Sequence, residues 1–351
     1  MGLFIIYQEA FYRAIVKSRI IRPLRMPDTT ESKLLGYADD TNILISNERS
    51  LIEVDKIISL FEKATGAVLN RNNKTKIFGT GKWRNRDRWP LSWLKVESQY
   101  LFTLGMYHCN SYTNSVEQNW SKCVSKINSH RLMLNSRRLT LFQRSTYANA
   151  CMASKVWYIT HVYPLPKNYA KEINKIIFNY IWNGRYEPVR RSTVFRSRIE
   201  GGLGTIDCLI KSQVILLNSF LKCNIDEDYH NPLMQYYCYM RMHNILDMNY
   251  SIHNCSITTT PYYEIIYGLL RKVIHIPGFP ILSNKNLYKF LLPREISYAE
   301  HQYPNFNWKN IWKNFSCTIF NPYEKEIIFK QKAICNRSKC NQIVYKLLRQ
   351  F

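Results

Sequence analysis

Long apolar runs are absent from this sequence, and so is a recognisable secretory leader. A helix needs roughly 20 predominantly apolar residues to cross a bilayer, and no stretch of the chain approaches that length. The first residues are apolar, but Glu9 and Arg13 interrupt them and no small-residue cleavage site follows. We therefore expect an intracellular protein, of the nucleus or the cytoplasm, that is not inserted in a membrane.

Paired cysteines are absent as well. The ten cysteines are scattered, and the closest two, Cys335 and Cys340, are not followed by a second pair of Cys or His. A structural zinc site needs four such ligands, so we expect no zinc site and interpret the cysteines as buried thiols of a reducing compartment. The chain also lacks an internal repeat, a phosphate-binding Walker loop, a Gly-rich dinucleotide fingerprint and a nucleophile elbow.

Acidic residues are scarce relative to basic ones. Lys and Arg total 49 against 25 Asp and Glu, so the formal net charge is +24. An excess of this size predicts a polyanionic partner, with nucleic acid as the first candidate and an anionic membrane surface as the second. Aromatic residues make up 14% of the chain, which suits either stacking on unpaired bases or ordinary core packing. A hydrophobic content of 46% over 351 residues is typical of a folded protein with two or three domains or subdomains.

The most informative stretch runs from Leu34 to Ile45. Two short apolar runs flank a polar turn, which is the pattern of a β-hairpin, and the turn carries Asp39 beside Asp40. Adjacent carboxylates repel each other unless a cation lies with them, and their oxygen atoms suit Mg²⁺. A pair of metal ions on carboxylates is an arrangement that transfers phosphoryl or nucleotidyl groups. The alternative is an ordinary turn, because Asp favours turns through its own backbone hydrogen bonds.

Apolar periodicity predicts helices over much of the remaining chain. We expect Asn47 or Ser50 to cap the start of the second helix, and Gly66 to cap its end. The residues from Tyr100 to Met106 predict a single strand. The predicted helices cover 3–18, 50–65, a segment from about 114, 173–181 and 207–223, with short helical or strand-like pieces around 262–275, 285–292 and 322–334.

Two segments concentrate positive charge. In the segment 79–98, tryptophans alternate with Lys and Arg. This loop either holds a phosphate backbone while its indoles stack on bases, or is simply solvated. Between Trp182 and Gly201 a cluster of arginines favours nucleic-acid contact, because Arg binds phosphate through two N–H groups and each neutralised phosphate releases counterions. These arginines are Arg185, Arg190, Arg191, Arg196 and Arg198.

The segment Tyr37-Ala38-Asp39-Asp40, between its apolar runs, resembles the metal-binding hairpin of reverse transcriptases. The segments after it follow in the order that this family has them. Thr65–Asn70 with Lys74-Thr75 resembles the G-x-x-x-N…K-T block of the palm, and Tyr100–Met106 is similar to the Y-L-G primer-grip strand. Phe178–Gly184 with Gly201–Gly204 resembles the region after the palm in LINE-type (non-LTR) retrotransposon polymerases. The resemblance extends from Met1 to about Lys222.

This resemblance implies an α+β fold in three parts. A partial reverse-transcriptase palm, an antiparallel sheet with helices, would occupy 1–110. A mainly helical, thumb-like region would follow over 111–225, and a C-terminal helical region of unknown role over 226–351. The implied activity is RNA-directed DNA polymerisation, a nucleotidyl transfer with an RNA template, a DNA primer and dNTP as partners and two Mg²⁺ ions as cofactors.

The resemblance also implies roles for individual residues. Asp39 and Asp40 would be catalytic metal ligands, and Lys74 would donate a proton to the leaving pyrophosphate. The spacing from Asn70 to Lys74 is one residue longer than usual, so an exposed loop lysine is the alternative. By the same resemblance, Tyr37, Leu104 and Gly105 would contact nucleic acid, as the arginine cluster would.

Some family features do not occur in this sequence. In the family an earlier palm strand carries the first catalytic aspartate, whereas the only Asp before the hairpin is Asp28, in a loop-like setting. Met1–Tyr7 resembles the palm helix just after its opening turn. We therefore expect a fragment without fingers that does not polymerise alone. The alternatives are a non-catalytic basic RNA- or DNA-binding remnant, and a gene fragment that does not fold stably. The sequence leaves the oligomeric state open.

Overall fold

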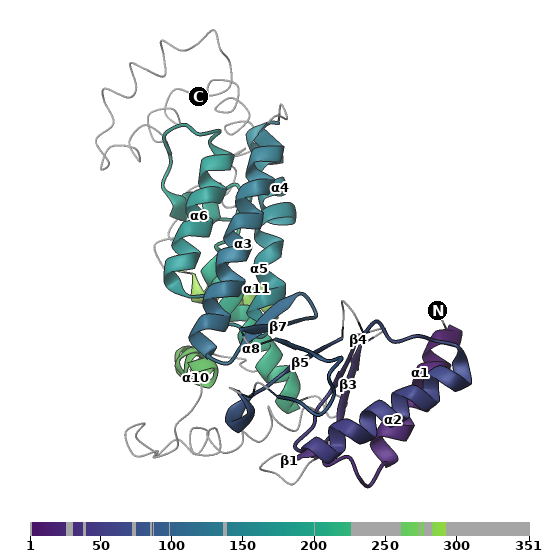
Figure 1. Ribbon diagram of the computed structural model, residues 1–351. Coiled ribbons are helices and arrows are strands. Elements are labelled where there is room, and N and C mark those ends of the chain that lie inside the picture. Colours follow the sequence, from purple (N-terminus) through teal and green to yellow (C-terminus); the bar gives the residue numbers. More distant parts are fainter. Residues whose placement is uncertain are drawn as a thin grey trace, which may run out of the picture. The chain divides into compact units, whose positions relative to one another are not determined.

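The protein is a mixture of helices and short strands in two compact units (Figure 1). The computed structural model describes residues 2–25, 31–37, 40–71, 75–84, 86, 88–97, 99–135, 139–199, 201–225, 261–273, 275–276 and 283–292. Unit 1 comprises Met1–Asn119 with Cys223–Ile257, and unit 2 comprises Trp120–Lys222 with Thr258–Phe351. The α+β class predicted from the sequence is confirmed.

Unit 1 alternates helices with short strands. Its elements are α1 (Gly2–Lys17), β1 (Leu24–Arg25), β2 (Glu31–Ser32), β3 (Leu34–Tyr37), β4 (Asp40–Ile43), α2 (Glu48–Thr65), β5 (Lys76–Phe78), a 3₁₀ turn (Gly81–Trp83), β6 (Lys95–Glu97), β7 (Tyr100–Thr103) and β8 (Met106–Cys109). In the described residues the strands pair two by two. The pairs β1–β2, β3–β4 and β7–β8 are antiparallel, and β5–β6 is parallel.

The core of unit 1 forms where α1, α2 and the β3–β4 hairpin meet. Ile15, Ile21 and Val54 are buried there, and Leu34 and Ile43, a directly opposed pair on the hairpin, pack against them. Burial of each such side chain is worth about 1.5–3 kcal/mol. The hairpin therefore has one face held by helices.

Helix α2 has the two caps that the sequence predicts. The Asn47 side chain accepts a hydrogen bond from the Ser50 backbone N–H at 2.8 Å, and Gly66 ends the helix with a φ of 71°. The Gly66 N–H donates to the Glu62 carbonyl at 2.9 Å. Asn at the start and a left-handed glycine at the end are the residues that satisfy the helix's orphan backbone groups.

The prediction of one strand over Tyr100–Met106 is wrong. The chain reverses at Leu104 and Gly105, and β8 runs back along β7 with Thr103 opposite Met106. Both turn residues have positive φ, at 48° and 77°. Such a turn matches the natural twist of paired strands, but leucine at its first position gives no sequence signal for it.

Unit 2 is helical throughout its described residues. Its elements are α3 (Tyr112–Asn135, which begins in unit 1), α4 (Leu141–Tyr147), the π-helix η2 (Ala148–Ala153), α5 (Ser154–Thr160), α6 (Lys167–Ile181), α7 (Arg191–Phe195), α8 (Cys208–Ile225), α10 (Pro261–Val273) and α11 (Asn284–Leu291). Figure 1 shows α3, α5 and α6 alongside one another. Trp120, Ile127, Ile177, Phe178 and Trp182 are fully buried in this unit.

The helices predicted from periodicity are confirmed where the structure describes them, and the pieces around 262–275 and 285–292, for which the sequence left helix and strand open, are helical. The piece predicted around 322–334 lies outside the described residues. Among the described helices, none combines the length and the apolar character that a bilayer crossing requires.

Candidate functional site

The β3–β4 hairpin carries the Y-A-D-D motif. Its register places Leu34 opposite Ile43 and Tyr37 opposite Asp40, so Ala38 and Asp39 are the two residues that connect the strands. This confirms the predicted hairpin. Asp40 is the first residue of β4 and is exposed, whereas Asp39 lies outside the described residues.

Helix α1 covers one face of this hairpin through hydrogen bonds as well as apolar contacts. The Tyr12 hydroxyl lies 2.9 Å from the Thr41 hydroxyl, and Gln8 Nε2 donates to both of these oxygens, at 2.6 and 3.2 Å. Thr41 is paired with Gly36 across the hairpin. A Cβ at Gly36 would come within 2.7 Å of the Tyr12 ring, so any larger residue would require the ring to shift from its present position.

The opposite face of the hairpin is open near the motif and meets a second hairpin farther along. Leu35 and Tyr37 are 56% and 70% exposed. Asn42, on the same face, donates from Nδ2 to the Thr103 hydroxyl at 3.3 Å, and Thr103 Oγ1 lies 3.4 Å from Asn42 Oδ1. Because Thr103 is the last residue of β7, this contact joins the Y-A-D-D hairpin to the hairpin that carries Tyr100–Met106.

The β7–β8 hairpin presents aromatic side chains and a strained turn. The rings of Phe102 and Tyr107, an opposed pair, lie 4.7 Å apart, and Tyr100 packs on Tyr107 at 5.0 Å. Leu104 occupies the left-handed region with φ of 48° and is 36% exposed. A non-glycine residue in this region is costly and needs the surrounding structure to hold it there.

The metal prediction rests on two carboxylates, of which the structure describes one. In the residues that the structure describes, no group of three or more His, Cys, Asp or Glu side chains is placed to hold a metal ion. Mg²⁺ requires near-octahedral oxygen coordination. Asp40 alone does not meet that requirement, so the described residues do not form a complete Mg²⁺ site.

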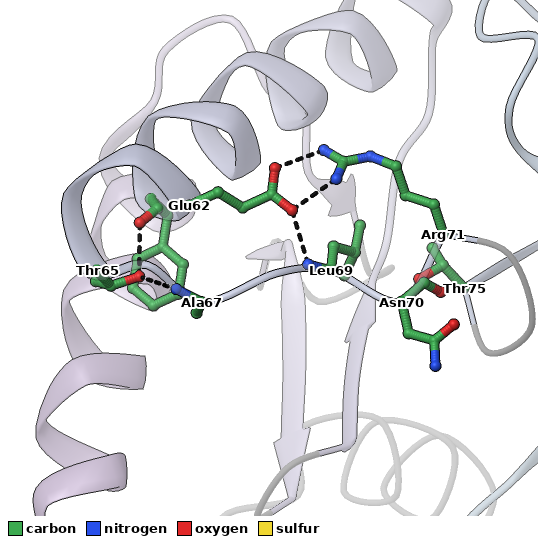
Figure 2. A network of polar contacts seen from close by, with 8 residues as sticks. Glu62, Thr65, Ala67, Leu69, Asn70, Arg71 and Thr75 are labelled. Carbon is green, nitrogen blue, oxygen red and sulfur yellow. Dashed lines mark hydrogen bonds and ion pairs between the residues drawn. The ribbon is translucent and has the colours of Figure 1, made fainter.

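The segment between α2 and β5, which contains the G-x-x-x-N…K-T block, is fastened by Glu62 (Figure 2). Its carboxylate accepts two hydrogen bonds from the Arg71 guanidinium, at 2.6 and 2.7 Å, and one from the Leu69 N–H at 2.7 Å. The Arg71 bond is the main reason why the pKa of Glu62 falls below its ordinary value. Thr75 donates through both its N–H and its hydroxyl to the Asn70 carbonyl, at 3.1 and 3.0 Å.

These bonds hold the residues on both sides of 72–74, and Lys74 itself lies outside the described residues. The Glu62–Arg71 pair was not predicted. The two residues are nine positions apart and on different elements, so no helical or strand period relates them.

The tryptophans of the 79–98 segment contact residues of their own chain. The Trp83 and Trp89 rings stack at 5.5 Å, and the Arg86 guanidinium lies over both, at 4.6 and 5.3 Å. Arg86 also pairs with Glu48. The Arg71 guanidinium lies 5.1 Å from the centre of the Trp93 ring. Neither interpretation of this loop, base stacking or simple solvation, predicted this packing of Trp83, Trp89 and Arg86 on one another.

The arginine cluster of unit 2 divides into residues with different surroundings. Arg191 makes a bidentate ion pair with Glu187, at 2.6 and 2.8 Å, which raises the pKa of its guanidinium, and it lies 4.7 Å from the centre of the Phe178 ring. Arg196 is half-buried, whereas Arg185, Arg190 and Arg198 are exposed. The exposed three are the members best placed to meet a phosphate backbone.

Arg198 lies beside a side chain that the sequence interpretation missed. Asn149, in the π-helix η2, donates from Nδ2 to the Gly204 carbonyl at 2.8 Å and accepts from the Ile206 N–H at 3.0 Å. It thereby holds the Gly201–Gly204 loop that follows the arginines. An asparagine inside a helical pattern is a weak signal for such a role, because mid-helix Asn is usually read as solvated.

No protein-family model matches the chain, and no curated protein matches it either.

Proposed function

We propose that the chain carries the catalytic hairpin and primer-contacting hairpin of an RNA-directed DNA polymerase of the LINE (non-LTR) retrotransposon type. The observation that supports this most is the contact between Asn42 and Thr103, because it brings the Y-A-D-D hairpin and the Y-L-G hairpin together. Asn42 and Thr103 are 61 residues apart in sequence. In this proposal 1–110 belong to a palm and 111–225 to a helical, thumb-like region, while the role of 226–351 is left open.

Each hairpin has a distinct part in the proposal. Asp39 and Asp40 would contribute carboxylates to Mg²⁺, which activates a primer 3′-hydroxyl when it is bound in a complete site. A further carboxylate would have to complete the ligand set, so the 351 residues alone are expected not to polymerise. Tyr37 and Leu104, which are both exposed, would contact an RNA template–DNA primer near its 3′ end.

A photocrosslinking experiment tests this placement without needing catalysis. An RNA template–DNA primer with a photoreactive group on the primer's terminal nucleotide is bound to the chain, irradiated and digested for mass spectrometry. Crosslinks in β3–β4 or β7–β8 support the proposal. Crosslinks confined to unit 2, or an unchanged pattern after Leu104→Asp and Tyr37→Asp, contradict it.

Primer extension with Mg²⁺ tests the catalytic part. The chain is compared with an Asp39→Ala, Asp40→Ala variant and with an acid-removal control, Glu117→Ala, Glu172→Ala, whose side chains are exposed on α3 and α6. Extension by the chain and the control, but not by the hairpin variant, would show a working enzyme and refute our expectation of inactivity.

A second candidate function is nucleic-acid binding without catalysis. The net charge of +24 and the exposed arginines of unit 2 favour it. It predicts salt-sensitive binding of RNA or DNA that is unchanged by the Asp39→Ala, Asp40→Ala variant and weakened by Arg190→Ala. Crosslinking of the primer end away from both hairpins would favour this function over the first.

A further inference from the structure

A shallow surface pocket of about 630 Å³, wide open to solvent, lies beside Arg198 in unit 2. Its walls come from the end of α4, the π-helix η2 and the loop from 197 to 204. The lining residues are Thr146, Asn149, Ala150, Ser197, Arg198, Ile199 and Gly204. Among these described residues are one guanidinium, two hydroxyls and an amide.

The π-helix shapes one wall of this pocket. In a π-helix the hydrogen bonds widen the turn, and such segments are often found at functional sites. Here the widened turn carries both Asn149, which holds the Gly204 carbonyl and the Ile206 N–H, and Ala150, which is exposed on the pocket wall. The wall is therefore tied to the loop that faces it.

The loop wall is equally well fixed. The Gly202 N–H donates to the Ser197 carbonyl at 2.9 Å, and the Gly204 N–H donates to the Arg196 carbonyl at 2.8 Å. A Cβ at Gly202 would overlap the Arg196 carbonyl, so this close backbone approach requires glycine. Gly204 has a φ of 69°. The pocket thus exists before any ligand binds, which lowers the ordering cost of binding.

Arg198 is held at the pocket with donors to spare. Its Nη2 donates to the Thr146 hydroxyl at 2.7 Å, its Nε lies 3.4 Å from the Leu203 carbonyl, and its guanidinium lies 5.2 Å from the centre of the Phe142 ring. A guanidinium has five N–H donors in a planar fork, and these two bonds use only part of that set. Next to it, Ile199 is 90% exposed, which places an apolar side chain at the rim.

We propose that this pocket binds a phosphodiester group of a polynucleotide, with the phosphate on Arg198 and the adjoining sugar or base against Ile199. A positively charged, hydroxyl-lined pocket suits an anion with several oxygen acceptors. The exposed isoleucine beside it suits a ligand with an apolar part, which inorganic phosphate lacks. This inference rests on the nucleic-acid partner of the proposed function, but not on polymerase activity.

Binding of a fluorescent RNA–DNA hybrid, measured by anisotropy across a salt series, tests the site. Arg198→Ala should weaken binding about five- to tenfold and lower the slope of log affinity against log salt by about 1, because one phosphate contact is lost. The matched control is Arg271→Ala, which removes an exposed guanidinium from α10 in the same unit. It should leave affinity and slope nearly unchanged. Equal effects of the two variants would overturn the proposal.

A second pair of variants keeps Arg198 and its packing intact. Ala150→Glu places a carboxylate on the pocket wall, and Ala150→Gln adds a neutral side chain of nearly the same size. Repulsion of phosphate predicts weaker hybrid binding for Ala150→Glu and little change for Ala150→Gln. Thermal melting of both variants checks folding. Identical binding by both folded variants would overturn the proposal even if Arg198→Ala failed to fold.

Competition distinguishes a polynucleotide from a free phosphate ligand. Unlabelled hybrid should displace the label at far lower phosphate concentration than pyrophosphate or a dNTP does. If Ala150→Glu instead weakened dNTP binding and left hybrid binding unchanged, the pocket would serve a mononucleotide and the proposal would be wrong. If Arg198→Ala and Ala150→Glu weakened hybrid binding while the primer crosslinked outside both hairpins, the polymerase assignment would be refuted and the phosphodiester site would still be supported.

Discussion

Replacing Gly36 by alanine should destabilise the Y-A-D-D hairpin through a single aromatic side chain. The new methyl would come within 2.7 Å of Cε2 and Cζ of Tyr12, and closer still to its hydroxyl. The ring must move away, and it then loses hydrogen bonds to Gln8 and Thr41. Overpacking typically costs about 1–3 kcal/mol, and each lost bond about 0.5–1.5 kcal/mol. We expect a net loss of about 2 kcal/mol in the free energy of unfolding.

A double-mutant cycle isolates this contact. Tyr12→Ala costs stability by itself but removes the obstacle, so Gly36→Ala in that background should be nearly neutral or slightly stabilising, since glycine weakens a strand. The expected coupling is about 2 kcal/mol. Urea unfolding gives the four stabilities, and hydrogen exchange of peptides from α1 and β3–β4 locates the effect. A Gly36→Ala cost below about 0.5 kcal/mol, or an equal cost in both backgrounds, would refute the reasoning.

Four further outcomes can be checked on purified variants. Leu104→Gly should stabilise the β7–β8 hairpin by about 0.5–1 kcal/mol in urea unfolding, because the turn requires positive φ there; a destabilised variant would contradict this. Arg71 lowers the pKa of Glu62, so the bonds to the 66–71 segment are complete above its ordinary value of 4.5 and are lost as pH falls through the lower folded value; the protection of amides there, relative to their intrinsic exchange rate at each pH, should fall in acid and should be lower at neutral pH in Glu62→Gln. Burial lowers the pKa of His108 below its ordinary 6.5, so thermal stability should fall as pH drops below about 6.5, and less so in His108→Gln. The Asp207 N–H donates to the Tyr288 hydroxyl at 2.8 Å, so Tyr288→Phe should cost about 1–2 kcal/mol in unit 2, whereas Tyr186→Phe, at an exposed position of the same unit, should cost less.

The sequence predicted those parts of the molecule that local patterns determine. The 3.6-residue period located α1, α2, α6 and α8, and the Asn47 and Gly66 caps marked the ends of α2, because caps depend on only a few neighbouring residues. The Y-A-D-D hairpin followed from two apolar runs around a polar turn. These features need no knowledge of distant residues.

The features that sequence reasoning missed depend on contacts between distant residues. Leu104 has a positive φ, which leucine disfavours, so tertiary packing overrides the local preference at this turn. Strands β5 and β6 pair in parallel, although the segment with Trp83 and Trp89 separates them in the sequence. No hydrophobic period predicts this pairing. In the candidate site, the nucleic-acid contacts of Tyr37 and Arg198 stay predictions, and only the structure distinguishes the exposed Arg198 from Arg191, which is paired with Glu187.

The π-helix between α4 and α5 takes up one residue more than a regular α-helix of the same rise would hold. Each residue of an α-helix turns the chain by about 100°, so an extra residue in regular α-helical geometry would rotate α5 by about that angle relative to α4, whereas the wider π turn absorbs it. Val156 and Thr160, buried on α5, thereby keep the phase of Leu141 and Ser145, buried on α4. Deleting one residue here should leave a regular helix in the same phase, but it would remove the widened turn from which Asn149 holds the Gly204 carbonyl.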